Sequence, residues 1–506
     1  MNDVVHVRDL VKTYGGVPAV DGIGFDVAIG ETFGLLGANG AGKTTTLECL
    51  LGVSRPDAGS VTILGLDPRT RRKELFQRVG VQFQEARYQD KITVDELCRA
   101  TRALYREADD PAKLLARFSL TEVRKQAVES LSGGQRQRLF VVLALIPRPE
   151  VVFLDELTTG LDVKARRDVW NLLDEMRQQG MTIVLTSHFM DEVEALCDRV
   201  IILRKGASSS KAPLPKLWRP VRSPASRTRT LRTRNLPNTL SPWKLPSLPQ
   251  PPISPREAPM KAFSTLFRVE FRLSLRDMNM PIFAVIMPVV VMLVVGMMFG
   301  DQPAYEGASY TFVAQSVGAV SAIGICAGGA MGLPLVVSNY RHRKILKRYF
   351  VTPVSVHTIL AVQVAIYTVY ALISAVLVFG VAALFFGYAF TGSWPAFVGS
   401  YVLVLAAMLA LGMMVGGLAP NEKVAGVLAS LLYFPMLLLS GTTLPYEMMP
   451  TAVQRGADLL PLTQGVKLLK ATSLGLPVDQ AVVPVAIMAV WAAVCTVIAV
   501  RFFKWE

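Results

Sequence analysis

Six long apolar segments dominate the second half of the chain. They cover residues 281–300, 312–336, 357–387, 396–419, 424–444 and 481–501. Each is about as long as the roughly 20 residues that a helix needs to cross the hydrocarbon core of a bilayer. Inside a bilayer a segment must satisfy its own backbone polar groups, which favours helices. The pattern therefore predicts an all-α domain of about six transmembrane helices over residues 260–506.

Residues 1–206 have the pattern of a globular domain. VVFLDE, residues 151–156, is a continuous apolar run of the kind found in a strand that is buried on both faces of a parallel sheet. ETFGLLGANGAGKTTTLECLLG, residues 31–52, runs from an apolar strand through three glycines into a helix. This order predicts an α/β domain of the P-loop NTPase class.

The glycine-rich segment fits the pattern GxxxxGK[ST] with Gly37, Gly42, Lys43 and Thr44. Glycines allow the backbone N–H groups of the loop to surround phosphate oxygens at the N-terminus of a helix. Lys43 then reaches the β- and γ-phosphates of a nucleotide, and Thr44 holds Mg²⁺. Taken alone, the pattern also fits an ordinary glycine-rich turn.

Two carboxylates follow the buried strand at residues 151–154. Ligands of a parallel sheet bind at the carboxyl ends of its strands, which places Asp155 and Glu156 near the phosphates. We expect Asp155 to bind the Mg²⁺ shell, and Glu156 to orient and deprotonate the attacking water. A strand followed by a solvated acidic turn is the alternative.

LSGGQRQR, residues 131–138, stands between these two motifs. Because of these three motifs together, residues 3–206 resemble the ATP-binding cassette (ABC) family. In that family an aromatic residue stacks on adenine, a loop glutamine contacts Mg²⁺, and a switch histidine touches the γ-phosphate. The matching positions are Tyr14, Gln84 and His188. The resemblance implies a catalytic role for Glu156, His188 and Gln84, and Mg²⁺ binding by Thr44, Gln84 and Asp155. It also implies a set of residues that contact the nucleotide: Tyr14, Gly37, Asn39, Gly40, Gly42, Lys43, Thr44, Thr45, Ser132, Gly133, Gly134, Gln135 and Asp162.

The family resemblance also implies a dimer. Two cassettes close head to tail, so that the signature residues Ser132–Gly134 of one cap the γ-phosphate held by Gly37–Thr44 of the other. This chain has one cassette, which implies a homodimer that uses ATP and Mg²⁺.

Two features depart from the family pattern. Leu157 stands where proline usually follows the catalytic glutamate. The cassette-like sequence stops at VIILRKG, residues 200–206, where related cassettes continue with another strand. The first domain is therefore expected to cover residues 1–206 and to be truncated at its C-terminal end.

Residues 260–506 resemble the type-2 ABC exporter permeases, which include the daunorubicin-resistance type. The resemblance rests on YRHRKILKRYFVTPVSV, residues 340–356, and on LSGTTLPYEMMP and LLPLTQG before the last span. In that family a basic stretch before a Thr-Pro pair docks on the ATPase, which would involve Arg341–Pro353 here. A charge cluster that only sets topology is the alternative. His342 stands where relatives commonly carry glutamate.

Charge orients the predicted helices. Residues 340–348 carry five basic residues, whereas the segments around Asp301 and Trp394 carry none. The positive-inside rule places the first segment in the cytoplasm and the other two outside, so both termini are expected in the cytoplasm. Residues 445–480 then lie outside, although they contain three basic residues. No cleaved signal peptide is expected, and the predicted location is the plasma membrane, with several passes.

Residues 207–259 form an unusual junction. They contain ten Lys or Arg and twelve Pro, and they carry much of the chain's net charge of +14. Such a composition cannot bury enough surface to fold, so a disordered tether near acidic lipid is expected. Nucleic-acid binding is a weaker alternative, because only two aromatic residues lie among the basic ones, and no nucleic-acid partner is predicted. A fusion of adjacent ATPase and permease reading frames through out-of-frame translation remains open.

These features predict an ATP-driven exporter. No Asp, Glu, Lys, Arg or His occurs in residues 281–300, 312–336, 396–419, 424–444 and 481–500, which argues against an ion-driven carrier. Their apolar composition suits a hydrophobic or amphiphilic cargo such as a drug, lipid or glycan, with membrane lipid as a further partner. The alternatives are a non-transport ABC ATPase and a frameshift-type fusion with impaired activity.

Overall fold

The computed structural model describes residues 3–84, 87–159, 161–204, 206–213, 257–300, 302–304, 308–443, 446, 449–477 and 479–503. The chain divides into two compact units. The first joins Met1–Thr265 with the short segment Lys347–Val356, and the second joins Leu266–Leu346 with His357–Glu506. We refer to them as the cassette unit and the membrane unit.

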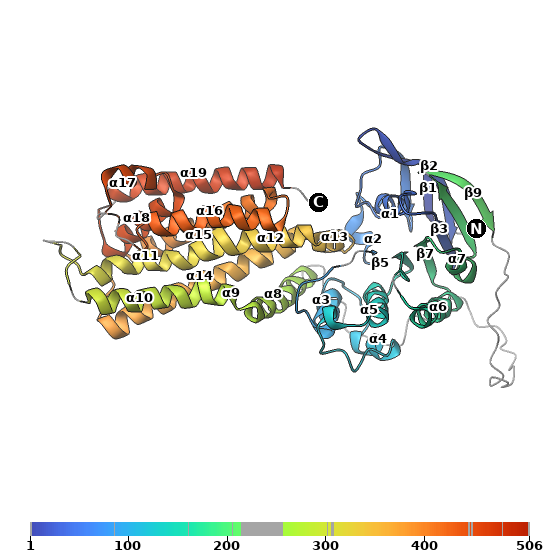
Figure 1. The fold of residues 1–506 in the computed structure, drawn as a ribbon, viewed down its shortest axis with the longest axis horizontal. Coiled ribbons are helices and arrows are strands. Elements are labelled where there is room, and N and C mark those ends of the chain that lie inside the picture. The colour runs from blue at the N-terminus through green and yellow to red at the C-terminus, as the bar shows by residue number, and fades with distance from the viewer. Residues whose placement is uncertain are drawn as a thin grey trace. The chain divides into compact units, whose positions relative to one another are not determined.

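The cassette unit is built on a six-stranded sheet (Figure 1). Its strand order is β5 (Val79–Gln82), β6 (Val151–Asp155), β7 (Thr182–Ser187), β3 (Thr32–Leu36), β8 (Arg199–Arg204) and β9 (Ala207–Pro213). The first five strands pair in parallel, and every residue of β6 and β7 is buried. The continuous apolar run at 151–154 reflects this burial on both faces of the sheet. The predicted α/β class with a parallel sheet is confirmed.

A second, antiparallel sheet has the order β2 (Val17–Ala28), β1 (Asp3–Tyr14), β4 (Ala58–Ile63). It shares a hydrophobic core with β3 and with α1 (Lys43–Leu50), the helix that follows the P-loop. The other helices of the unit are α2 (Arg72–Leu75), α3 (Val94–Ala103), α4 (Pro111–Arg117), α5 (Gly133–Leu145), α6 (Val163–Gln178) and α7 (Met190–Leu196).

The sheet does not stop at Gly206, where the sequence predicted the end of the cassette. Residues Ala207–Pro213 form β9, which pairs antiparallel with β8. The Gly206 N–H also donates to the carbonyl of Ala41 in the P-loop, and its carbonyl accepts from the N–H of Asp21. The predicted strand that seemed missing is therefore present within the first residues of the basic tract. The tether was predicted at 207–259: its first seven residues form β9 and its last three begin α8 (Glu257–Asp277), whereas residues 214–256 lie outside the described residues.

The membrane unit is helical, and six of its helices are long and apolar enough to cross a membrane. They cover Asn279–Phe299, Phe312–His342, Val356–Phe386, Trp394–Leu418, Glu422–Leu439 and Val482–Phe502. These match the six predicted apolar spans. The unit also contains α8 (Glu257–Asp277), whose first residues belong to the cassette unit, and α17 (Thr451–Ala457) and α18 (Pro461–Leu474).

Small residues allow close helix packing in the second span. This span consists of α11 (Phe312–Cys326), a π-helical turn at Ala327–Gly332, and α12 (Leu333–His342). A Cβ on Gly329 would lie 2.8 Å from the backbone of Met408 on α15 (Trp394–Leu418), which means that the two backbones are nearly in contact.

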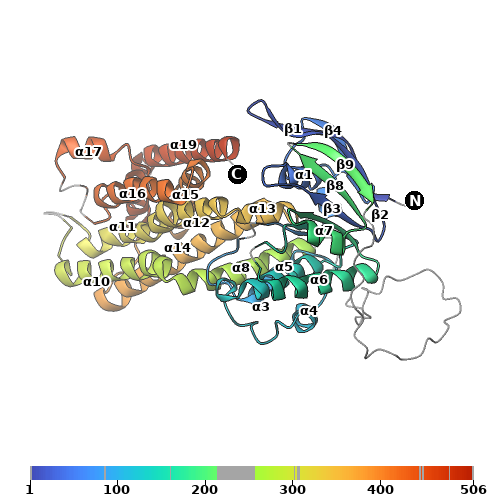
Figure 2. The ribbon, with the colours of Figure 1, turned by 45° about the vertical axis from the view of Figure 1, so that its right-hand side comes forward.

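The short helices α17 and α18 gather at one end of the membrane unit. Both views place α17 at the end where α10 (Met287–Phe299) finishes and α11 begins (Figure 2), and Figure 1 shows α18 at the same end. The helix α18 is mostly buried and packs against α11, α15 and α19 (Asp479–Phe502). This end of the bundle therefore has a folded cap rather than simple loops.

Candidate functional site

The P-loop connects β3 to α1 with the geometry that phosphate binding needs. Gly42 is the N-cap of α1 and has a φ of 93°, and a Cβ at this position would lie 2.2 Å from the carbonyl oxygen of Ala19. Only glycine fits both restrictions. The first N–H groups of α1 have no partner within the helix and form a site for an anion. Thr44 and Thr45 lie in this first turn and are partly exposed.

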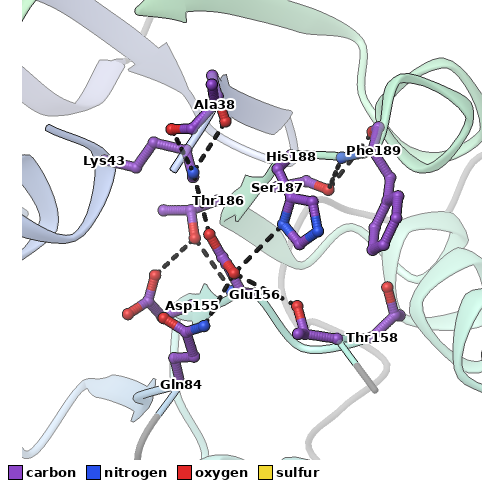
Figure 3. A network of polar contacts seen from close by, with 12 residues as sticks. Ala38, Lys43, Gln84, Asp155, Glu156, Thr158, Thr186, Ser187, His188 and Phe189 are labelled. Carbon is purple, nitrogen blue, oxygen red and sulfur yellow. Dashed lines mark hydrogen bonds and ion pairs between the residues drawn. The ribbon is translucent and has the colours of Figure 1, made fainter. Parts of the chain in front are cut away.

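Lys43 points back across the mouth of this loop (Figure 3). Its ammonium group donates to the carbonyls of Gly37 at 2.8 Å and Ala38 at 3.2 Å, and it lies 3.0 Å from Oε1 of Glu156. The side chains of Lys43 and Glu156 are 4% and 5% exposed, so this is a buried ion pair. The cation expected to hold the phosphates and the carboxylate expected to activate water therefore contact each other.

Glu156 is the centre of a wider network. Its Oε2 accepts hydrogen bonds from Nε2 of Gln84 at 2.9 Å and from the hydroxyl of Thr159 at 3.3 Å, and it lies 3.3 Å from Nδ1 of His188 (Figure 3). Glu156 also has a φ of 44°, which is uncommon for a residue with a side chain and is held here by its neighbours. The structure thus brings together Lys43, Gln84, Glu156 and His188 from four separate segments.

Asp155 is held by a residue that the sequence did not indicate. The hydroxyl of Thr186, on the neighbouring strand β7, donates to Oδ1 of Asp155 at 2.6 Å and accepts from the N–H of Glu156 at 3.0 Å. Burial raises the pKa of Asp155, whereas hydrogen bonds from Thr186 and from the backbone of Gln84 oppose that rise. Thr186 therefore holds both the carboxylate of Asp155, a predicted Mg²⁺ ligand, and the backbone of the predicted catalytic residue Glu156.

The expected Mg²⁺ ligands fit a hard cation in their chemistry. The hydroxyl of Thr44, the amide of Gln84 and the carboxylate of Asp155 offer the oxygen ligands that Mg²⁺ prefers. Asp155 is 1% exposed, and an ionised carboxylate this buried is stabilised by a nearby cation. In the present conformation the Gln84 amide donates to Glu156.

Glu192 is a second residue that sequence reasoning missed. It lies on α7, is 3% exposed, and accepts from the hydroxyls of Thr158 at 2.9 Å and Ser187 at 2.5 Å. Burial raises its pKa, and these hydrogen bonds oppose the rise. It ties the turn after β6 to the end of β7, just before His188. No motif marks Glu192, because its role depends on which strands are neighbours.

The signature residues form a separate cluster. Ser132 is the N-cap of α5, and a reciprocal pair of hydrogen bonds joins it to Gln135. Asp162 caps α6 and accepts from the N–H of Ala165 at 2.7 Å. The two helix starts line one hollow of about 450 Å³, which also includes Gly133 and Gly134. Within the described part of the chain, this hollow contains the predicted signature residues but none of the P-loop.

The predicted adenine contact stands apart from the Glu156 network. Tyr14, at the end of β1, is 52% exposed, which leaves its ring accessible for stacking. The strand end is fixed by Asp57, which accepts from the backbone N–H of Thr13 at 2.7 Å, from its hydroxyl, and from Lys12. These hydrogen bonds lower the pKa of Asp57 to about 2. Asn39 and Gly40 are exposed in the P-loop.

The short segment Lys347–Val356 packs within the cassette unit. Its helix α13 (Ile345–Phe350) ends against Arg72, whose guanidinium donates to several backbone carbonyls of the segment. The acceptors are the carbonyl oxygens of Tyr349, Phe350, Thr352 and Val354. Lys347 forms an ion pair with Glu48 on α1. The docking element predicted at Arg341–Pro353 is thus partly confirmed.

Its N-terminal boundary was wrong. Arg341 belongs to the membrane unit and is 7% exposed. Its guanidinium donates to the carbonyls of Gly416 at 3.1 Å and Ala419 at 2.8 Å, at the C-terminal end of α15. A cation is favourable there because the last carbonyls of a helix lack partners. Arg341 therefore stabilises a helix end, while Lys347 and the residues that follow it meet the cassette.

Comparisons with known families match the two units separately. The ABC transporter family matches residues 20–159, and the ABC-2 type transporter family matches residues 261–474. A Nod factor export ATP-binding protein I from Burkholderia orbicola (strain AU 1054) is 42% identical over 207 residues, which are 40% of this chain and 68% of that protein. The protein of the same name from Rhizobium meliloti (strain 1021) is 40% identical over 207 residues, 40% of this chain and 62% of its own.

Solved structures show similar cassettes. The ADP conformation of an ATP-binding cassette of an ABC transporter is 21% identical, with a TM-score of 0.39, and covers 42% of this chain and 92% of its own. The curated relatives match the cassette at a level that identifies the family, and the second family covers the apolar helices. The chain belongs to the ABC transporters and joins an ABC ATPase domain to an ABC-2 type transporter domain.

Proposed function

We propose that this chain exports an apolar or amphiphilic solute from the cytoplasm and is driven by ATP hydrolysis in its cassette. The observation that supports this most directly is the convergence of Lys43, Gln84 and His188 on the Glu156 carboxylate, in the same chain as six helices of membrane-spanning length. The curated relatives are named for the export of Nod factors. From these names we take the outward direction of transport.

The buried pair of Lys43 and Glu156 suggests how ATP binding prepares hydrolysis. A γ-phosphate offers Lys43 several negative oxygens, and it would replace Glu156 as the partner of the ammonium group. Glu156 is then free to accept a proton from water, while Gln84 and His188 remain within reach of the reacting phosphate. Thr44, Gln84 and Asp155 would hold Mg²⁺, which would supply positive charge next to the phosphates.

The working unit in this proposal is a homodimer. The signature cluster of Ser132–Gln135 and Asp162 lines a hollow of its own, so it does not complete the P-loop of the same chain. A second copy that closes head to tail would place this cluster over the nucleotide held at Lys43. In a two-fold pair both nucleotide sites are complete, because each site takes its P-loop from one chain and its signature residues from the other.

The membrane arrangement follows from charge. The segment Lys347–Val356, which packs within the cassette unit, begins with the last two basic residues of 341–348. Since the cassette uses cytoplasmic ATP, this loop belongs on the cytoplasmic side, with both termini. The caps α17 and α18 then face the outside. The cargo is expected to be apolar or amphiphilic, because the spans offer little charge.

Replacing Glu156 with Gln tests the proposal. The variant keeps a hydrogen-bonding side chain of the same size but cannot accept a proton, so ATP turnover should fall by about 10²–10⁴-fold while ATP still binds. Efflux of a fluorescent amphiphile from proteoliposomes should stop in parallel. Glu122→Gln, which alters an exposed carboxylate, is the matched control and should retain both activities.

Two results would count against the proposal. ATP turnover that survives Glu156→Gln would remove this carboxylate from catalysis. A wild-type chain that hydrolyses ATP but moves none of a panel of amphiphiles would favour the alternative of a non-transport ABC ATPase.

A further inference from the structure

The helix α8 leads into the first span but is not continuous with it. It ends at Asp277, and the span begins at Asn279. Met278, between them, has a φ of 59°, a left-handed conformation that interrupts a right-handed helix. The direction of α8 is therefore set by its own packing and not by the span that follows.

One face of α8 packs within the membrane unit. The ring centre of Phe271 lies 5.5 Å from that of Tyr370 on α14 (Val356–Phe386). The buried residues on this side of α8 include Leu266, Val269 and Leu273. The apolar surface of the helix is thus already covered by protein, so only the opposite face can meet another partner.

The opposite face carries two exposed arginines, Arg268 and Arg272, which lie one helical turn apart. We call them the arginine pair. Among the residues that the structure describes, neither arginine has a hydrogen bond or an ion pair. The tract before α8, residues 207–256, contains no Asp or Glu. This part of the helix therefore presents two positive charges to its surroundings.

The acidic residues near the pair on α8 face other groups. Glu270 is buried, and its carboxylate accepts from the hydroxyl of Tyr340 at 2.5 Å and from Nε2 of Gln363 at 3.1 Å. Asp277 lies five residues after Arg272, about 140° round the helix from it, and accepts from a neighbouring amide. Neither carboxylate is placed to balance the arginine pair.

The depth of the pair follows from the contacts between α8 and α14. Glu270 accepts from Gln363, and the hydroxyl of Ser274 lies 2.9 Å from that of Tyr370. At 1.5 Å per residue, Gln363 and Tyr370 lie about 34 Å and about 24 Å from the end of α14 at Phe386. The hydrocarbon core of a bilayer is about 30 Å thick, so its boundary falls between these two contacts.

The arginine pair lies at this boundary. Arg272 stands between the two contacts in the sequence, and Arg268 lies one turn further toward the cytoplasm. This placement rests on the proposed arrangement of the membrane unit, in which the Val356 end of α14 is cytoplasmic. Long arginine side chains at such a level reach the head-group layer, which extends about 5–8 Å beyond the core.

We infer that the arginine pair of α8 binds the phosphate groups of anionic glycerophospholipids in the cytoplasmic leaflet. A guanidinium group donates two parallel hydrogen bonds to one phosphate, which suits the diester of a lipid head group. A zwitterionic head group fits less well, because its own cation offsets the phosphate charge. The inference goes beyond ATP-driven export, since it requires neither nucleotide nor cargo.

Photolabelling tests the site. The full chain is reconstituted without nucleotide in phosphatidylcholine vesicles that contain a small fraction of phosphatidylglycerol with a diazirine in its head group, and labelled peptides are mapped by mass spectrometry. The label is expected within residues 260–277, and unlabelled phosphatidylglycerol should displace it. Because no nucleotide is present, a failure of ATP-driven export would leave this result unchanged.

Variants locate the contacts. Arg268→Gln and Arg272→Gln should each lower labelling of α8 by about fivefold, and the double variant by at least tenfold, since each basic residue near an anionic surface adds to the attraction. Arg268→Lys with Arg272→Lys keeps both charges and should retain most of the labelling. Arg501→Gln removes an exposed arginine at the end of α19, the last span, and should label α8 as the wild type does.

Four results would overturn the inference. Unchanged labelling in the double Gln variant would show that the arginine pair does not hold the lipid. An equal loss in Arg501→Gln would reduce the effect to the overall charge of this side of the membrane unit. Equal displacement by phosphatidylcholine would remove the requirement for an anionic head group. Displacement by free glycerol phosphate as efficient as by phosphatidylglycerol would identify a site for a soluble anion.

Discussion

At the scale of single residues, the Glu156 carboxylate is shared among groups with opposing tasks. Lys43 approaches one of its oxygens, while Gln84 and Thr159 donate to the other. Breaking a buried ion pair on one side is costly, because the remaining charge loses its compensation. The ion pair of Lys43 and Glu156 is thus expected to persist until a stronger anion reaches Lys43. Removal of Lys43 should therefore disturb Glu156 as well as phosphate binding.

Thr186 offers the sharpest test at this scale. Thr186→Val keeps the shape of the side chain but leaves Oδ1 of Asp155 and the N–H of Glu156 without their shared partner. Unsatisfied buried groups of this kind cost about 1–3 kcal/mol each. We expect a lower thermal midpoint and a lower kcat for ATP hydrolysis. Thr186→Ser retains the hydroxyl and should recover most of both; equal loss in the two variants would contradict the role given to this group.

Sequence motifs predicted part of this site and not the rest. Lys43, Asp155 and Glu156 belong to patterns whose spacing alone implies phosphate and metal chemistry. Thr186 and Glu192 do not, because threonine and glutamate are common, and their importance depends on β6 and β7 being neighbours in the sheet. The Lys43–Glu156 contact is equally invisible in the sequence, since 112 positions separate the pair.

At the scale of elements, the start of α1 depends on one backbone conformation. Gly42 has a left-handed conformation, and Ala19 on β2 closes the space where a side chain would go. In the same region, the N–H of Gly206 donates to the carbonyl of Ala41. Ala19, near the start of β2, and Gly206, just before β9, therefore hold the P-loop in place. This also sets the position of the phosphate-binding N–H groups of α1.

Gly42→Ala tests that dependence. A Cβ would lie 2.2 Å from the carbonyl oxygen of Ala19, so the loop or β2 must move, and ATP affinity should fall by at least tenfold in an equilibrium binding assay. Gly180→Ala is the matched control, because Gly180 has a similar φ of 84° but open space around it. That variant should lose a little stability and keep normal ATP affinity. Comparable losses of affinity in both variants would argue against the close approach to Ala19.

One strand, β9, was missed from the sequence. Residues 207–213, ASSSKAP, have no apolar alternation and begin a tract rich in basic residues and proline, which favours disorder. They form β9 because the edge of β8 offers unpaired backbone groups, and a backbone ladder needs no particular side chains. The six helices of membrane-spanning length, in contrast, were predicted correctly, since length and apolarity alone determine that assignment.

At the scale of the whole molecule, the chain passes from the membrane unit into the cassette unit at Lys347 and returns at His357. Val351 of this excursion is buried in the same hydrophobic core as strands β1 and β3. We expect a segment embedded in this way to move with the cassette, and its two ends continue into the membrane unit. This is the physical basis on which cassette closure would act on the spans.

Arg72→Gln tests that connection. The substitution removes the cation that binds four carbonyls of the segment, and hydrogen bonds to charged groups are worth about 1.5–3 kcal/mol each. We expect the amount of solute moved per ATP hydrolysed to fall by at least tenfold, while ATP turnover stays within about twofold. Arg71→Gln, which affects an exposed pair with Glu74, is the control. Unchanged coupling in Arg72→Gln would show that this contact does not transmit motion.

Arg72 recognises its partner segment through main-chain oxygens. Every amino acid presents the same carbonyl, so this part of the joint is indifferent to which side chains the segment carries, provided that its turn is preserved. The joint should tolerate exchange of loop residues other than Lys347, which pairs with Glu48, and Val351, which is buried in the cassette core, provided that the backbone path is kept. An ATPase that binds backbone carbonyls in this way could be combined with foreign permeases. The cassette unit is therefore a reasonable starting point for building chimeric transporters.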